Sequence, residues 1–211
     1  MTSLMVLSGI LGALLLGAMS PGPSFVLVSK IAIAGSRRDG VSTALGMGVG
    51  GAIFAALALI GLITLLQQVE WLYLTVKICG GLYLVFLGIR IWRHARGSLV
   101  LDPREQGPTS NSLRRSFFLG LATQLANPKT AVVYASVFAA LLPSEPSQTL
   151  LVMLPISVLL LEFGWYTLVA VAFSNPVPQG AYLRGKKWFD RLAGGVLGAL
   201  GVRLIAEEAR W

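Results

Sequence analysis

Two ionisable side chains, Lys129 and Glu162, lie inside long apolar stretches of this sequence. Each is near the middle of a stretch long enough to cross a bilayer, where a charge costs roughly 2.5–3.5 kcal/mol on insertion scales. Such residues face the interior of a helix bundle and have a partner there. Two interpretations fit the pair: an ion pair that holds two helices together, or two walls of a cavity. In the second, Lys129 would bind a carboxylate, and Glu162 would bind an ammonium group or a coupling proton.

Helix-breaking residues interrupt two of the apolar stretches. Pro21-Gly22-Pro23 interrupts the first, and Asn127-Pro128 directly precedes Lys129 in a later one. Proline removes a backbone donor and clashes with the preceding turn. In lipid, the freed backbone groups must be covered by protein or by a water-filled cavity. The breaks therefore predict a binding site. Its candidate residues are Pro21, Gly22, Pro23, Ser24, Asn127, Pro128, Lys129 and Glu162, with Trp165 and Tyr166 on the same helical face as Glu162.

The apolar stretches predict an all-α integral membrane protein with six transmembrane helices. Hydrophobic residues make up 55% of the 211 residues and charged residues 12%, whereas soluble domains carry about 25% charged residues. The mean hydropathy is +0.74. A span needs about 20 residues. The predicted spans are 4–34, 43–66, 71–91, 116–142, 149–173 and 188–205, and residues 35–40 and 175–187 are predicted polar loops.

Basic residues gather in alternate loops of this six-span arrangement. Of the 17 lysines and arginines, 13 lie in or beside the loops after spans one, three and five. The positive-inside rule places those loops in the cytoplasm and both termini outside it. The same rule accounts for the net charge of +8, so we expect no nucleic-acid partner.

A weak internal repeat divides the chain into two halves of three spans. Gly81 and Gly88 recur at a constant offset as Gly194 and Gly201, and the two breaks also correspond. An odd number of spans per half inserts the halves in opposite directions, which is the inverted-repeat arrangement of many secondary transporters. We therefore expect one transmembrane domain with broken helices one and four. Its parts would be repeat one at 1–92, a linker at 93–115 and repeat two at 116–211.

Catalysis and metal binding find little support in the sequence. There is one cysteine and one histidine, and no nucleophile–base pair, metal-ligand spacing or phosphate-binding loop. We expect no enzymatic activity, cofactor or metal site. Gly46-x-Gly48-x-x-Gly51 matches a dinucleotide-binding pattern, but no strand precedes it, so close helix packing is expected instead. Gly194-x-x-x-Gly198 is also expected to pack helices, and its use in a homo-oligomer stays open.

Four motifs occur in a characteristic order along the whole chain. They are Ser20-Pro21-Gly22-Pro23, the Gly46–Gly51 cluster, Gly80-Gly81-x-Tyr83-Leu84-x-x-x-Gly88, and Gly120 followed by Asn127-Pro128-Lys129. This order resembles the LysE/RhtB family of bacterial amino-acid exporters. The resemblance implies a proton-driven secondary transporter in the inner membrane that exports a small amino acid of the threonine or homoserine class. In the family, an acidic or amide residue commonly follows Pro-Gly-Pro, whereas Ser24 follows it here.

Two alternatives stay open beside this hypothesis. One is a different small cargo on a related scaffold, such as a metal ion or reducing equivalents. The single histidine and single cysteine weigh against that cargo. The other is a non-transporting membrane scaffold subunit, in which Lys129 and Glu162 would matter for stability but not for flux. The expected partners are the amino acid and the lipid bilayer.

Overall fold

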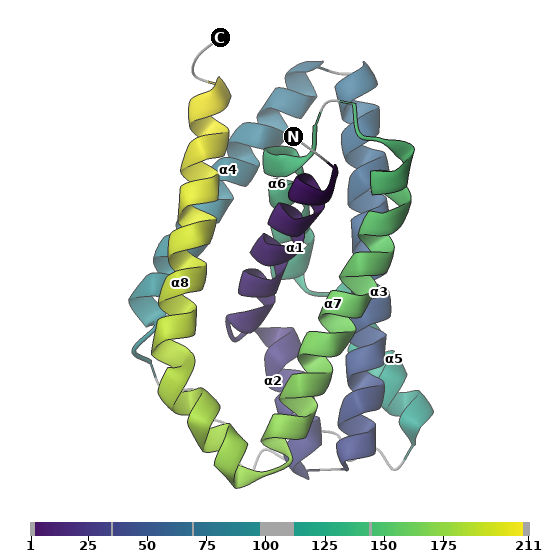
Figure 1. Cartoon of the computed structure of the whole chain (residues 1–211), viewed down its shortest axis with the longest axis vertical. Coiled ribbons are helices and arrows are strands. Elements are labelled where there is room, and N and C mark those ends of the chain that lie inside the picture. The colour runs from purple at the N-terminus through teal and green to yellow at the C-terminus, as the bar shows by residue number, and fades with distance from the viewer. Residues whose placement is uncertain (1–2, 35, 69, 98–111, 144, 209–211) are drawn as a thin grey trace.

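The computed structural model describes residues 3–34, 36–68, 70–97, 112–143 and 145–208, and these residues fold into α-helices without strands. The predicted all-α fold is therefore confirmed for this part of the chain (Figure 1). The helices are α1 (Ser3–Met19), α2 (Pro23–Ala34), α3 (Arg37–Gln68), α4 (Glu70–His94), α5 (Leu113–Leu125), α6 (Pro128–Leu141), α7 (Gln148–Phe173) and α8 (Pro176–Glu208).

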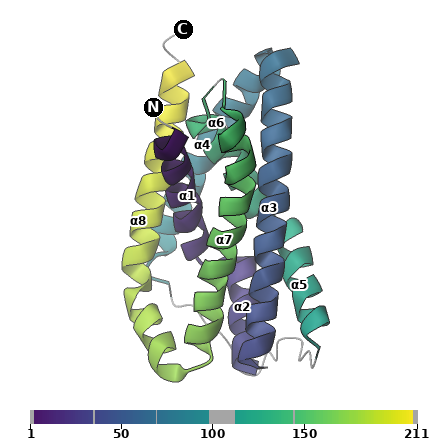
Figure 2. The same cartoon turned by 45° about the vertical axis from the view of Figure 1, so that its right-hand side comes forward.

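Both predicted breaks are present. The first separates α1 from α2 and bends the pair by 59°. The second separates α5 from α6 at Ala126-Asn127. The helices α1 and α2 follow each other end to end (Figures 1 and 2). The helix α1 packs against α6, α7 and α8, and α2 packs against α3, α5 and α7. Ser20 and Ser24, on either side of the first break, are buried, so this break lies in the interior of the bundle.

Polar and apolar side chains are arranged as in a membrane protein. The apolar side chains of Leu57, Ile60 and Leu160 are each more than half exposed on the outside, while Gln124 and Glu162 are buried inside. Among the described residues, α3, α4 and α7 each contain a stretch long and apolar enough to span a membrane. The bent pair α1–α2 qualifies as one further span, and α6 is a shorter apolar helix. The count of six spans stays a prediction.

The two predicted polar loops are wrong, because both are largely helical. The helix α3 already begins at Arg37, since Ser36 caps it: the Ser36 hydroxyl oxygen accepts from the Asp39 N–H (3.1 Å), and the Ser36 carbonyl accepts from the Gly40 N–H (3.0 Å). The helix α8 begins at Pro176 rather than near Trp188. Proline is well tolerated in the first turn of a helix, where its missing N–H has no intrahelical acceptor.

Glycines allow α4 and α8 to cross at close distance. A Cβ atom added at Gly88 would lie 2.6 Å from the Gly194 carbonyl oxygen, and one added at Gly194 would lie 2.7 Å from the Gly88 carbonyl oxygen. Gly81 and Gly201 face each other in the same way, at 3.0 and 2.5 Å. Real Cβ contacts are longer than this, so any side chain at these positions would force the helices apart. The expected packing role of Gly194 is thus confirmed within the chain itself.

This packing predicts opposite effects for two glycines on one helix. Gly194→Ala should destabilise the fold by about 1–3 kcal/mol, because the added methyl group overpacks the contact with α4. Gly198→Ala is the matched control, since a Cβ there meets nothing within 4 Å. It should be neutral, or stabilising by up to about 1 kcal/mol through helix propensity. Thermal unfolding of the two purified variants measures the difference, and equal melting temperatures would contradict the assignment.

Candidate functional site

The carbonyl groups left open at the end of α1 are bound by side chains from two other helices. The Lys129 ammonium group donates to the carbonyl oxygens of Gly17 (3.1 Å) and Ser20 (3.0 Å). The Tyr182 hydroxyl donates to the Met19 carbonyl oxygen (3.0 Å). The last four carbonyls of any helix have no intrahelical donor. The first break is therefore covered by α6, which carries Lys129, and by α8, which carries Tyr182.

The second break is closed by Asn127. The side-chain oxygen of Asn127 accepts from the backbone N–H of Lys129 (3.1 Å), and Pro128 occupies the first helical position. Asparagine is among the best N-cap residues, and proline suits the position after it. The short polar sequence at the break thus ends α5 and starts α6 in a defined geometry. It also directs the side chain of Lys129 toward the end of α1.

A buried hydrogen-bonded chain joins the two breaks. The Ser24 hydroxyl donates to the Gln124 side-chain oxygen (2.7 Å) and accepts from the Asn127 side-chain amide (3.0 Å). All three residues are buried. The sequence placed Ser24 and Asn127 in one site, and the structure brings them into direct contact. Gln124 was not a candidate, although it lies only three residues before Asn127, on the last turn of α5.

Glu162 lies deeper in the bundle, beside a tyrosine. Its Oε1 accepts from the Tyr134 hydroxyl (2.7 Å). Its Oε2 is buried and makes no hydrogen bond within the described ranges. Gly51 of α3 gives the pair its room, since a Cβ there would lie 3.0 Å from the Glu162 Cγ and 3.1 Å from the Tyr134 hydroxyl oxygen. The glycine cluster of α3 thus serves close packing, as the sequence predicted.

The structural ion pair proposed for Lys129 and Glu162 is not formed. Lys129 binds backbone carbonyls and Glu162 binds Tyr134, although both side chains line one small cavity. This inner cavity has a volume of about 30 Å³, which is enough for one or two water molecules. Ser24, Asn127 and Tyr166 also line it.

A larger outer cavity of about 430 Å³ lies on the other side of the breaks. Ser20, Gly22, Asn127 and Lys129 line both cavities, so the broken backbone forms the partition between them. The remaining walls of the outer cavity come from the first break, α4, α6 and α8. They include Pro21, Pro23, Pro128, Arg90, Lys186 and Asp190.

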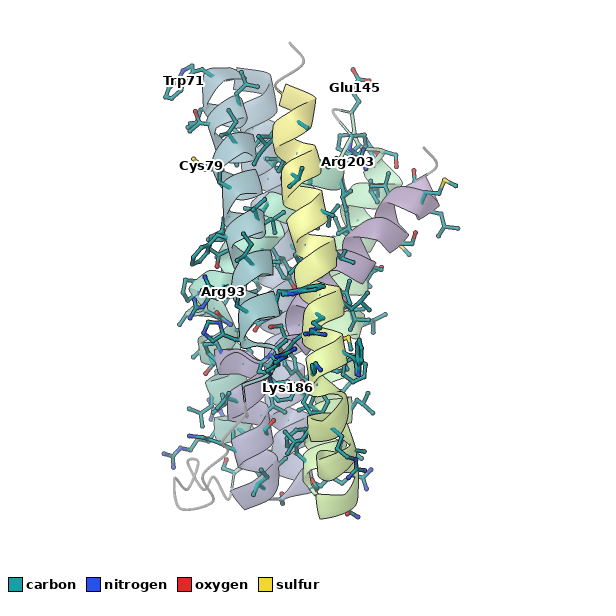
Figure 3. All side chains as sticks on the ribbon, turned by 90° about the vertical axis from the view of Figure 1, so that its left-hand side faces the viewer. Trp71, Cys79, Arg93, Glu145, Lys186 and Arg203 are labelled. Carbon is teal, nitrogen blue, oxygen red and sulfur yellow. The ribbon has the colours of Figure 1, made fainter. Side chains whose placement is uncertain are left out.

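Nine of the ten candidate site residues therefore line one cavity or both. Trp165 lines neither; it is partly buried and packs against a core cluster that contains Phe25. Sequence reasoning missed Tyr134, Lys186 and Asp190. Lys186 had been assigned to a loop, yet Figure 3 shows it partway along α8 rather than at a helix end. The spacing of Lys186 and Asp190, four residues apart, was the available signal.

Comparisons with known proteins agree with the sequence motifs. The model of the LysE type translocator family matches residues 15–208. The chain is 34% identical to the threonine efflux protein of Escherichia coli K12 over 188 residues, which cover 89% of this chain and 91% of that protein. It is 28% identical to the leucine efflux protein of Enterobacter sp. 638 over 190 residues, covering 90% and 88% respectively. No solved structure matches the chain significantly.

The hydrogen bonds of Ser24 predict a loss of stability when they are removed. Ser24→Ala should cost about 1–3 kcal/mol, because it leaves the buried polar groups of Gln124 and Asn127 without a partner. Ser29→Ala on the same helix is the matched control: Ser29 is buried, but its hydroxyl has no partner in the described residues. That change should be neutral or stabilising. Thermal unfolding of both variants checks this, and equal destabilisation would refute the bridging role.

Proposed function

The chain belongs to the LysE family, and from this premise we propose that it exports a small amino acid of the threonine or homoserine class across the bacterial inner membrane by proton antiport. The observation that carries the proposal is the pair of helix breaks that meet at Lys129, which shares a small cavity with the buried carboxyl group of Glu162. Discontinuous helices of this kind form the substrate sites of many secondary transporters. The names of the two relatives, threonine and leucine efflux proteins, support an amino acid as cargo.

The chemistry of the partition suits a zwitterion. The helices α2 and α6 begin at the breaks, and their first N–H groups and positive dipole ends favour a carboxylate, as does the ammonium group of Lys129. An amino acid bound here would place its carboxylate at this partition. Its own ammonium group would turn to Glu162, whose Oε2 has no hydrogen-bond partner among the described residues. The residues proposed to contact substrate are thus Gly22, Ser24, Asn127, Lys129, Glu162 and Tyr166, with the three prolines shaping the backbone.

Glu162 is also the proposed proton-coupling residue. It is an ionisable group at the centre of an apolar helix, and such groups serve as proton relays in pumps and transporters. A carboxyl group that binds either a proton or a substrate ammonium group cannot hold both at once. Competition of this kind would couple the export of one amino acid to the import of protons.

The glycine contacts between α4 and α8 support the proposed inverted repeat. In the proposed repeat, Gly81 corresponds to Gly194 and Gly88 corresponds to Gly201. Exchanging each glycine for its counterpart turns the Gly81–Gly201 contact into the Gly194–Gly88 contact. A contact that reproduces itself in this way between antiparallel helices has two-fold symmetry. In addition, α1 begins and α8 ends at the same end of the bundle (Figure 1). Both features favour six spans with the two termini on one side of the membrane.

Topology is tested by reporter fusions. A fusion at Gln106 should report the cytoplasm, and a fusion after Trp211 should report the outside, because the basic loops favour the cytoplasm. Paired reporters that are active only inside or only outside give the measurement. A cytoplasmic C-terminus would contradict both the six-span arrangement and the inverted repeat.

Transport is tested by efflux of labelled threonine from proteoliposomes under an imposed pH gradient, normalised to protein level. Glu162→Gln should insert and fold but lose proton-dependent efflux by about ten-fold or more, because the coupling carboxyl is gone. Glu162→Gln combined with Lys129→Met should stay inactive.

Abundance and efflux together separate a site from a scaffold. Lys129 and Glu162 do not pair with each other, so the decisive variant is Glu162→Gln alone, which leaves the Lys129 hydrogen bonds to Gly17 and Ser20 in place. If Glu162 served only structure, this variant would lose abundance but keep proton-dependent efflux per molecule. Proton-dependent efflux at the level of the unchanged chain would therefore defeat the proposal.

A further inference from the structure

The outer cavity contains a carboxylate that the proposed mechanism does not use. Asp190 is 3% exposed and lines this cavity. Its Oδ2 accepts from the ammonium group of Lys186 (2.6 Å), one helical turn earlier on α8. Its Oδ1 is buried and has no hydrogen-bond partner in the part of the chain that the structure describes. A buried carboxylate oxygen without a donor is costly, so one is expected to receive a donor from elsewhere.

The remaining charges around the cavity are positive. Arg90 and Lys129 line it together with Lys186, and Asp190 is the one carboxylate among the described lining residues. A ligand that carries both a carboxylate and an ammonium group matches this distribution. Its carboxylate would face Arg90 and Lys129, and its ammonium group would supply the donor that Asp190 Oδ1 lacks.

The two cavity volumes favour the outer one as the first place where an amino acid fits. The inner cavity has room for water only, whereas the outer cavity, at about 430 Å³, lies in the range of small-molecule sites. Lys129 faces both. A carboxylate held at Lys129 could therefore stay in place while the ammonium group moves from one acidic partner to the other.

We propose that the outer cavity is a second amino-acid site, at which Asp190 binds the substrate's α-ammonium group before that group passes to Glu162. Lys186 is a positioning residue that holds the Asp190 carboxylate through Oδ2 and leaves Oδ1 to the ligand. This proposal rests on the proposed transport of an amino acid. At the second site, the protein would select ligands that carry a charged amine before they reach the partition.

The test is equilibrium binding of labelled L-threonine to the purified full-length chain that carries E162Q. This change removes the inner carboxylate, so the binding that is left reports the outer cavity. Adding K186M/D190N neutralises both members of the pair and leaves no buried charge unpaired. It should weaken binding at least about ten-fold, as expected for a lost charged hydrogen bond. Adding Glu145→Gln instead is the control, because Glu145 is exposed and lines neither cavity.

A second measurement needs no change at Asp190. On the E162Q chain, N-acetyl-L-threonine, which lacks the ammonium group, should compete at least about ten-fold less well than L-threonine. Equal competition by the two ligands, or no binding at all by the E162Q chain, would overturn the Asp190 site while the proposed export function still stands. If the unchanged chain binds neither threonine nor homoserine, the proposed substrate class fails, and the second site fails with it.

Discussion

Backbone groups at two interrupted helices must find partners inside the protein, and this constraint fixes the centre of the structure. In lipid no water can replace those partners, so each orphan carbonyl or N–H requires a donor or acceptor from the chain itself. The carbonyls at the end of α1 receive an ammonium group from α6 and a hydroxyl from α8. Helices that are distant in sequence are thereby joined at one point. The same point separates the two cavities.

In the proposed mechanism, the use of Lys129 as a cap would give the partition two alternative states. Its ammonium group now satisfies the Gly17 and Ser20 carbonyls, and a bound carboxylate would compete with them for its three donors. Binding of the carboxylate would therefore weaken the closure at the end of α1. In the proposed mechanism, substrate recognition and rearrangement of the break are one event, which is how a local contact biases a larger conformational change.

Local patterns allowed much of the site to be predicted from the sequence. Two helix-breaking residues close together in an apolar stretch, as at Pro21-Gly22-Pro23 and Asn127-Pro128, allowed both breaks to be placed, whereas the single Pro155 lies inside α7. The interior position of Lys129 and Glu162 followed from hydropathy. The actual partners could not be predicted, because the carbonyls that Lys129 binds are more than 100 residues away. Hydropathy also misassigned the starts of α3 and α8, since capping by Ser36 and proline at a first turn stabilise helices whose first turns are polar. Because Lys186 fell in the predicted loop before α8, its pairing with Asp190 was missed.

In the proposed transporter, the two unequal cavities lie on the two sides of the partition. Arg90 lines the larger cavity near the end of α4, where the linker that the positive-inside rule assigns to the cytoplasm begins. In this orientation the larger cavity would face the cytoplasm, and the inner cavity would be the narrow point on the route to the other side. In an inverted repeat, the two halves can exchange conformations and open the opposite side around a fixed site. The shared partition, with Lys129 in reach of both cavities, is the element that such an exchange would leave in place.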